Sequence, residues 1–502
     1  MSTDSVGTAP SAIAGARKSY LSRFVLDAVK QAPATLFMAV FSILIAAYYT
    51  RVFPAEKYGI YSAAIAFSGP IVTLMTEWVA QPIGRMYSEY RFRNQMPVFW
   101  QSINVFSSGA LALFLFGAVV VWQILPDGTK GIYRNIYLET SAVIVLQAMT
   151  SILLPIFPAS FNTHLFRRLT LLTALCSAGI AIALILLFGK NIEFLIVGQA
   201  ISLAIFLPLA IHWSGWQRPT LQGMQSVRLW HTLRRMAVYG LPMMLWFLSS
   251  SLLDLGDRYV IQWFRGSAEV GIYSVNYSLM AGIVMLINVP VGVVLGPLLF
   301  EQWSRRDLAG TTKTLGQMTT LYVVIACALL GAGALASEPL VRLLLGKEFH
   351  VGQSFLVPIL LARAVWGASM IGQKSLELRE KTRTMMVVAV LSALLNLLLN
   401  LWLVPRYGYI AAAYTTLVSY IFYTGLIYAE TRSVVPWTID RGPALTAMVA
   451  ALGAYALAAL ASRTWAPVLI LTAGSLLFII LFGTLFLSMS RATRTAVKQY
   501  LQ

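Results

Sequence analysis

A few charged side chains lie inside long apolar stretches of this 502-residue sequence. Arg363 lies near the middle of the stretch 352–373, and Glu77 lies within the stretch 58–80. Asp254, Asp257 and Arg258 lie together toward the end of the stretch 237–262. A charge at bilayer depth is costly, so such a residue usually faces a cavity or a partner and marks a functional pathway. These residues are the first candidates for a site.

Residue patterns typical of enzymes are missing from the sequence. Cys176 and Cys327 both lie in apolar stretches, and the four histidines are scattered without the spacing of a metal-ligand set. There is no P-loop, no GxSxG elbow and no HExxH motif. We therefore expect no cofactor, no metal and no ATPase or metalloenzyme activity.

The composition is that of a polytopic all-α membrane protein. Hydrophobic residues make up 58% and charged residues 11%, whereas soluble domains carry about 25% charged residues. The first 31 residues lack the apolar core of a cleavable signal peptide. Apolar stretches of bilayer length predict fourteen transmembrane helices, at 32–50, 58–80, 98–124, 139–159, 169–189, 192–212, 237–262, 272–299, 316–336, 352–373, 384–404, 408–428, 443–461 and 465–488.

Basic residues are divided unequally between the two sides of this layout. The N-terminal segment, the C-terminal tail and the loops on their side hold 25 Lys and Arg, and the opposite loops hold 11. Such an excess is the positive-inside signature, which places both termini in the cytoplasm. The same basic loops account for the net charge of +18, so we expect no nucleic-acid partner.

An internal repeat divides the chain into two similar halves. A shift of 212 residues superposes Gly59-Ile60-Tyr61-Ser62 on Gly271-Ile272-Tyr273-Ser274, and it also pairs Glu89 with Glu301 and Arg93 with Arg305. An even number of spans separates the copies, so the two halves should share one orientation about an axis along the membrane normal. The predicted parts are a cytoplasmic segment 1–31, a six-helix lobe 32–213, a cytoplasmic connector 214–236, a second six-helix lobe 237–430, and two additional helices with a tail in 431–502.

Four segments in this order resemble the Wzx-type oligosaccharide-lipid flippases. They are RVFPAEKYGIYS (51–62), LDLGDRYVIQWFRGSAEVGIYS (253–274), LLLGKEF (343–349) and PRYGYIAAAYTTLVSYIFY (405–423). The family belongs to the superfamily that also holds the lipid II flippases and the multidrug and toxin extruders, and the resemblance covers about residues 22–490. It implies a V-shaped transporter in the bacterial inner membrane whose lobes open alternately to either side.

The resemblance also implies a substrate and partners. The substrate would be an undecaprenyl-pyrophosphate-linked oligosaccharide, moved from the inner to the outer leaflet for O-antigen, capsule or exopolysaccharide synthesis. Transport would be driven by an ion gradient, with H⁺ or Na⁺ as the coupling ion, or by substrate consumption on the far side. Membrane lipids and the polysaccharide polymerase machinery would be the other partners.

For a flippase of this kind, each candidate residue has an expected functional role and a structural alternative. Arg363 would anchor the pyrophosphate or sugar, or else be a structural cation paired with a carboxylate or helix-end carbonyls. Arg85 would receive the pyrophosphate at the cytoplasmic end, or else be an anchor that snorkels to the interface. Glu77 would be a protonatable coupling group, or else pair with Arg85 or lie near the boundary.

The remaining candidates are polar residues of the seventh and eleventh spans. Asp254, Asp257 and Arg258 would close the outer gate, or else Asp254 and Arg258 form a structural intrahelical pair four residues apart. Asn396 and Asn400, also four apart, would contact sugar, or else form hydrogen bonds between helices.

Two other functions compete with the flippase. A multidrug extruder would share the two-lobe plan, but it fits better with carboxylates inside the lobes than with an intramembrane arginine. A membrane polysaccharide polymerase or glycosyltransferase needs catalytic groups at the membrane surface, commonly on a large outer loop, and every predicted outer loop is short.

Overall fold

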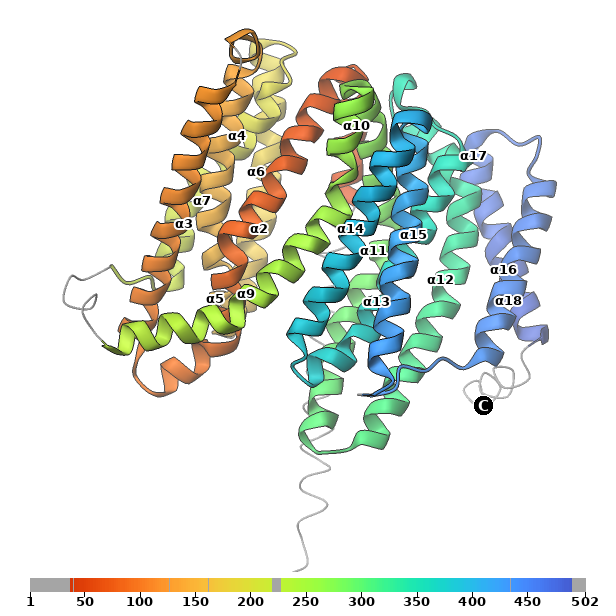
Figure 1. Ribbon diagram of the computed structural model, residues 1–502. Helices are drawn as coiled ribbons and strands as arrows, with labels where there is room; N and C mark the ends of the chain where they lie inside the picture. Colours follow the sequence, from red (N-terminus) through yellow and green to blue (C-terminus); the bar gives the residue numbers. More distant parts are fainter. Residues whose placement is uncertain are drawn as a thin grey trace, which may run out of the picture.

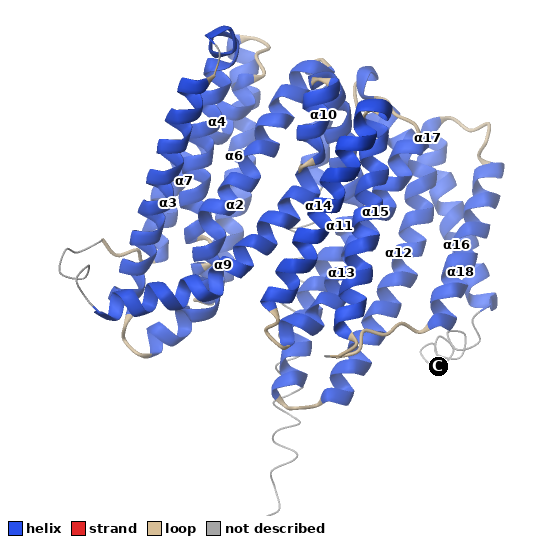
Figure 2. Cartoon of the chain, viewed as in Figure 1, coloured by secondary structure: helices blue, strands red, loops and turns tan. Residues whose placement is uncertain are grey.

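The chain is folded into long helices. The computed structural model describes residues 37–38, 40–125, 127–160, 162–218, 227–433 and 435–489, and the regular structure in these ranges is helical throughout (Figure 2). After a short helix, Val40–Val52, the main helices are α2 (Ala55–Phe92), α3 (Met96–Ile124), α4 (Asp127–Leu153), α5 (Ile156–Ala159), α6 (Thr163–Phe188), α7 (Glu193–Ser214), α9 (Val227–Leu255), α10 (Asp257–Arg265), α11 (Ser267–Ser304), α12 (Leu308–Leu344), α13 (Gln353–Leu378), α14 (Thr382–Tyr407), α15 (Tyr409–Thr431), α16 (Arg441–Ala461), α17 (Pro467–Leu469) and α18 (Ser475–Met489).

Thirteen helices among the described residues are long and apolar enough to cross a membrane, which confirms the prediction of a polytopic all-α protein. They correspond to the last thirteen of the fourteen predicted spans. The first predicted span, 32–50, lies partly outside the described residues, and Val40–Val52 is a shorter apolar helix within it.

The seventh span differs from its prediction at its beginning. It was expected to begin at residue 237, whereas α9 begins at Val227. Leu229, Thr232 and Met236 are buried in this extension while Arg234 and Arg235 are exposed, so one amphipathic face continues the helix beyond the apolar stretch. Part of the predicted connector 214–236 is therefore helical, and residues 219–226 lie outside the described ranges.

The internal repeat is confirmed by the backbone. The helices α2 and α11 both contain 38 residues, and their bounds differ by the same 212 positions as the tetrads. Each is followed by a turn with a non-glycine residue at positive φ, namely Asn94 at 53° and Arg306 at 59°. These two residues also differ by 212, so the two halves share helix length and turn geometry.

The first glycine of each tetrad lies where α2 and α11 cross. A Cβ atom on Gly59 would lie 1.7 Å from the carbonyl oxygen of Ser267, and one on Gly271 would lie 2.1 Å from that of Ala55. Ala55 and Ser267 are equivalent in the repeat, so the contact is reciprocal. A pseudo-twofold axis therefore passes between the two glycines, whose missing side chains allow the backbones to touch.

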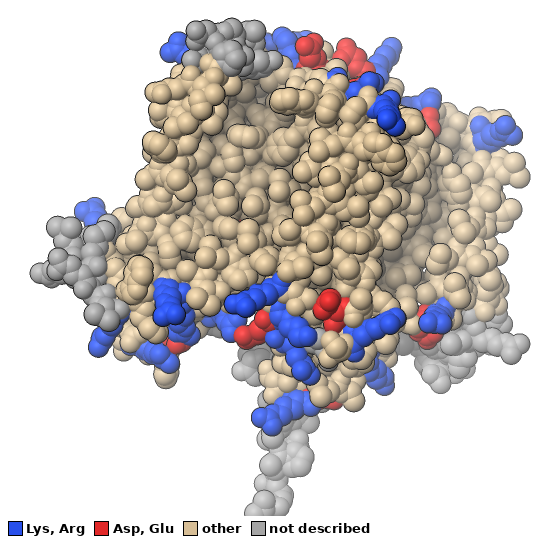
Figure 3. Space-filling model, in the orientation of Figure 1, with Lys and Arg blue, Asp and Glu red and all other residues tan. Residues whose placement is uncertain are grey.

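The helices form two groups that meet along α2, α9 and α11. Figure 1 shows α3, α4, α6 and α7 in one lobe and α11 to α15 in the other, with α16 to α18 at the far edge. The helix α2 packs on α4 in its own lobe and on α9 and α11 across the interface, and α16 packs on α12. In Figure 3 a broad band without charged side chains separates two charged rims, as expected for a membrane-embedded surface. The residue limits of the lobes remain a prediction.

Candidate functional site

The site begins at a break between α9 and α10. Gly256 occupies the break, and a Cβ atom there would lie 2.4 Å from the carbonyl oxygen of Leu252. Glycine permits this tight turn because it has no side chain. Asp254 and Asp257 lie on either side of the break, and their carboxylates reach different partners.

Arg363 of α13 forms an ion pair with Asp254 of α9. Its Nη1 donates to Asp254 Oδ1 at 2.8 Å and to the hydroxyl of Tyr277 at 3.3 Å. Tyr277 in turn donates to the same carboxylate oxygen at 2.5 Å. The side chain of Arg363 is 13% exposed and that of Asp254 is 39% exposed. The structure thus contains the pairing that the plainer interpretation of Arg363 expected, and Arg363 itself also lines a cavity.

Arg258 does not form the expected intrahelical pair with the Asp254 carboxylate. Its Nη1 donates to the main-chain carbonyl of Asp254 at 2.8 Å, and its Nε donates to Ser274 at 3.0 Å. The break at Gly256 leaves that carbonyl free for the guanidinium, while Arg363 takes the carboxylate. This part of the sequence interpretation is wrong.

Asp257 is fully buried and accepts three hydrogen bonds from neutral groups. Asn400 Nδ2 donates to Oδ1 at 2.6 Å, and the hydroxyls of Tyr273 and Thr416 donate to Oδ2, each at 2.6 Å. Asn400 also donates to Asn396 Oδ1 at 3.0 Å, and Asn396 Nδ2 has no partner among the described residues. Asp257 forms no ion pair with any described residue, although buried carboxylates normally have one.

A cavity of about 500 Å³ lies beside Arg363. Its lining comes from α9, α11, α12, α13 and α14, and Gln81 contributes from α2 in the other lobe. Arg363, Lys374 and Glu377 are its charged lining residues, and Lys374 pairs with Glu377 at 2.6 Å. Arg363 is therefore the one charged lining residue whose ion-pair partner, Asp254, lies outside the cavity wall, and its Nε has no partner among the described residues.

Aromatic and amide side chains form much of the remaining cavity wall. Trp246, Phe247 and Trp366 line it together with Tyr322 and Asn288. Tyr322 donates to Asn288 Oδ1 at 2.8 Å, which fixes the orientation of that amide. A concave site with aromatic faces, a few polar groups and one cation can accommodate a ligand that carries both sugar rings and an anion.

Glu77 and Arg85 lie on α2 but are not paired with each other. They are eight residues apart, or about 12 Å along a helix. Glu77 accepts a hydrogen bond from Gln81 at 2.8 Å, and Arg85 pairs with Glu380, after α13, at 2.7 Å. The alternative that pairs Glu77 with Arg85 is therefore wrong, and Gln81 links Glu77 to the edge of the cavity.

The lobes are joined at both membrane rims. At one rim Arg51 donates to the carbonyl of Leu343 at 2.7 Å, and the main-chain nitrogen of Ala55 donates to Glu348 at 2.8 Å. At the other rim the Arg85–Glu380 pair connects α2 to the end of α13. The cavity is thus bridged on both sides, as in a closed state of a two-lobe protein.

Reversing the charge of Arg85 is expected to open the rim that it bridges. Arg85 and Glu380 are 42% and 64% exposed in their side chains, so the pair contributes only about 0–1 kcal/mol to stability. A cysteine at cavity residue Met370 should react faster with a thiol reagent added from that side in Arg85→Glu. Adding Glu380→Arg should restore the slow rate.

Arg305→Glu is the matched control, because Arg305, at the end of α11, pairs with Glu301 of that helix and forms no ion pair with another helix among the described residues. An equal increase in reactivity for this control would mean that general charge effects, and not the bridge, set access to the cavity.

Asn396 and Asn400 lie away from the cavity lining. They are 3% and 0% exposed and bond to each other, and Asn400 also bonds to Asp257 of α10, so the structure favours the interhelical alternative over a sugar contact. Sequence reasoning missed Tyr277, Asn288 and Glu380. The polar Asn288 inside an apolar span was an available signal, whereas the other two gave none.

A comparison with protein-family profiles matches residues 32–303, more than half of the chain, to the family described as "Polysaccharide biosynthesis protein". The chain belongs to this family. A search of curated protein sequences returns no match.

Solved structures share the fold at low sequence identity. A structure of the lipid II flippase MurJ in an inward closed conformation has a TM-score of 0.72 and 17% identity, and covers 90% of this chain and 98% of its own. A mutant of the Vibrio cholerae MATE transporter VcmN has a TM-score of 0.57 and 14% identity, covering 83% and 97%. An inward-facing MATE family multidrug transporter of the MOP superfamily has a TM-score of 0.56 and 12% identity, covering 80% and 94%. These likenesses confirm the two-lobe membrane fold.

Proposed function

We propose that this protein is a flippase for an undecaprenyl-pyrophosphate-linked oligosaccharide. It moves the lipid from the inner to the outer leaflet of the bacterial cytoplasmic membrane by alternating access, for surface or exopolysaccharide synthesis. The observation that carries the proposal is the cavity with Arg363, amides and aromatic rings at the lobe interface of a polysaccharide biosynthesis family member. The protein catalyses no covalent step in this proposal.

The cavity chemistry assigns roles to the parts of the headgroup. The guanidinium of Arg363 suits a pyrophosphate, since arginine forms charge-assisted and often bidentate hydrogen bonds with phosphate oxygens. Trp246 and Trp366 provide flat apolar faces for sugar rings, and Asn288 provides an amide. Arg85, at the rim, is the group that an entering anion meets first, and such an anion competes with Glu380 for it.

The coupling ion is assigned to Asp257. A buried carboxylate without an ion pair is stabilised when a proton or a metal cation neutralises it. The hydroxyl oxygens of Tyr273 and Thr416 contact its carboxylate, and either H⁺ or Na⁺ would neutralise the charge there. Glu77 is the second candidate, and Asp254 and Arg258 act as gating residues through their bonds across the break at Gly256.

The orientation follows from the charge excess in the sequence. The rim that carries Arg85 and Arg235 is assigned to the cytoplasm, together with both chain termini. The headgroup then enters from the Arg85 side and leaves past Arg51 and Glu348.

The decisive experiment is deletion of the gene in its host, followed by mass spectrometry of undecaprenyl-linked lipids. A complete repeat unit should accumulate, and in spheroplasts its sugar should be inaccessible from outside until the wild-type gene is restored. Normal lipid levels combined with new sensitivity to cationic drugs would overturn the flippase and favour a multidrug extruder, whose fold is also similar.

A further inference from the structure

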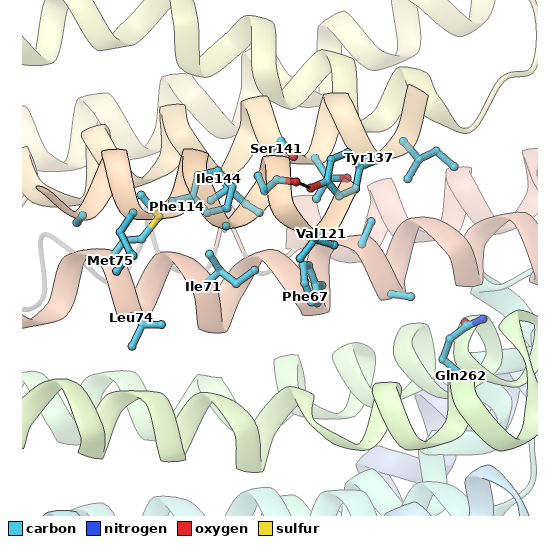
Figure 4. Close-up of a pocket in the computed structure, with 18 of the residues that line it drawn as sticks. Phe67, Ile71, Leu74, Met75, Phe114, Val121, Tyr137, Ser141, Ile144 and Gln262 are labelled. Carbon is cyan, nitrogen blue, oxygen red and sulfur yellow. Dashed lines mark hydrogen bonds between the residues drawn. The ribbon is translucent and has the colours of Figure 1, made fainter. Parts of the chain in front are cut away.

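A second cavity, of about 730 Å³, lies between the lobes and is lined almost entirely by apolar side chains. Its walls come from α2, α3 and α4 of the first lobe and from α9 to α11 of the second. Figure 4 shows Leu74, Met75 and Phe114 toward one end and Tyr137 and Gln262 toward the other. Its volume lies within the range of about 300–1,000 Å³ typical of ligand pockets.

The cavity follows one face of α2 for most of the bilayer thickness. The lining residues of α2 recur three or four positions apart, and they are Ile60, Ala63, Ala64, Phe67, Ile71, Leu74, Met75 and Trp78. From Ile60 to Trp78 a helix rises about 27 Å, and the hydrocarbon core is about 30 Å thick. The shape is that of a slot for an extended chain.

One small residue in this slot, Gly117, is not used for helix packing. Small residues in membrane helices normally let neighbouring helices approach closely. Gly117 lines the slot, yet a Cβ atom there would meet nothing within 4 Å. By contrast, Gly240 of α9 is pressed against the carbonyl oxygen of Trp78. The space beside Gly117 is therefore available to a ligand.

Two lining side chains carry polar atoms without a partner among the described residues. These atoms are Thr140 Oγ1 and Gln262 Oε1, and Thr140 is only 8% exposed. Both atoms are themselves buried, so they offer no polar contact to a ligand, and the accessible surface of the slot is apolar.

The slot ends where the polar cavity begins. Trp78 lines the slot and Gln81, one turn later on α2, lines the polar cavity. On α9 the consecutive residues Met244 and Met243 line the slot and the polar cavity respectively. An amphipathic ligand can therefore place its head beside Arg363 and its tail along α2.

We propose that the slot holds the head-proximal part of the isoprenoid tail of the transported lipid. The assignment rests on the proposed function and adds a tail site to it, between the lobes and opposite the C-terminal helices α16 and α18. Both lobes contribute walls to the slot and to the polar cavity. A rocking motion of the lobes therefore changes both cavities together, so that the head and the tail of the lipid move in the same step.

The test uses full-length protein in nanodiscs and a polyprenyl monophosphate with a diazirine near its phosphate end. Labelled peptides should come from α2 and α3, and unlabelled polyprenyl phosphate should compete. Gly117→Trp, which fills the slot, should lower this labelling at least tenfold and reduce rescue of the deletion strain. Gly117→Leu should give a smaller reduction in labelling. If the tryptophan variant does not fold, the labelling of Gly117→Leu decides whether the slot holds the tail.

Gly109→Trp is the matched control. It lies on the same helix, a Cβ atom there also meets nothing within 4 Å, and it does not line the slot. Its labelling should stay within twofold of wild type. Unchanged labelling in the Gly117 variants, equal labelling by a diazirine phosphatidylethanolamine, or labelling confined to α16 and α18 would overturn the tail site. Failure of the flippase itself looks different, because no lipid intermediate then accumulates in the deletion strain.

Discussion

Arg363→Ala is expected to abolish transport of the lipid-linked oligosaccharide while leaving a folded protein in the membrane. A hydrogen bond to a charged group is worth about 1.5–3 kcal/mol, so losing even one to the pyrophosphate lowers affinity by about tenfold to a hundredfold. The deletion strain expressing this variant should continue to accumulate the inward-facing lipid intermediate. The same mass spectrometry and spheroplast assay measures the effect.

A structural role for Arg363 has to be separated from a binding role. Removing Arg363 leaves Asp254 unpaired, which costs about 1–3 kcal/mol, toward the lower end because the Asp254 side chain is 39% exposed. The double variant Arg363→Gln/Asp254→Asn removes both charges and should recover thermal stability. If Arg363 holds the anion, this variant still fails to transport, whereas Arg363→Lys keeps part of the activity. Wild-type transport by the double variant would show that Arg363 only balances Asp254.

The sequence predicted the fold well because the relevant signals are local. Apolar stretches of bilayer length and a repeat at constant spacing do not depend on distant contacts, so α2 and α11 could be paired in advance. Helix bounds were less accurate. The first residues of α9 are amphipathic, and in the sequence they resemble a polar loop. The break at Gly256 lies inside an apolar stretch in which the sequence shows no interruption.

The charged residues of the candidate site could be recognised in the sequence, but their pairings could not. Arg363, Asp254 and Asp257 were visible because charges in apolar stretches are rare. Their partners are not encoded locally. Arg363 lies 109 positions from Asp254, and Asp257 lies 143 positions from Asn400. Local spacing suggested that Asp254 pairs with Arg258 and that Glu77 pairs with Arg85. Instead Arg363, from another helix, pairs with Asp254. The amide of Gln81, four residues away, bonds to Glu77.

Asp254 and Asp257 lie on either side of the break at Gly256, and their carboxylates bond to different helices. Asp254 bonds to Arg363, which lines the polar cavity, and Asp257 bonds to the buried cluster with α14 and α15. A shift of the short segment between them would alter both sets of bonds together. An element that bonds to two sites can couple them if it has two arrangements, so we expect neutralisation of Asp257 to separate ion use from lipid transport.

Asp257→Asn is expected to remove the dependence of transport on an ion gradient. The amide has the shape of the carboxylate and can still accept from Tyr273 and Thr416, but it neither binds a proton reversibly nor attracts a cation. In proteoliposomes an imposed H⁺ or Na⁺ gradient should accelerate wild-type flipping of the lipid and leave the Asp257→Asn rate unchanged. Running the two gradients separately identifies the ion.

Asp307→Asn serves as the control, because Asp307 caps α12 through its hydrogen bond to Gly310 and asparagine caps a helix about as well as aspartate. Its response to the gradient should equal that of wild type. If Asp257→Asn keeps the acceleration and Glu77→Gln loses it, coupling belongs to α2 in the first lobe, and the buried cluster around Asp257 only holds α10, α14 and α15 together. The pair of variants thus assigns the ion to one lobe or the other, since each carboxylate lies within a single bundle and bonds to no charged partner among the described residues.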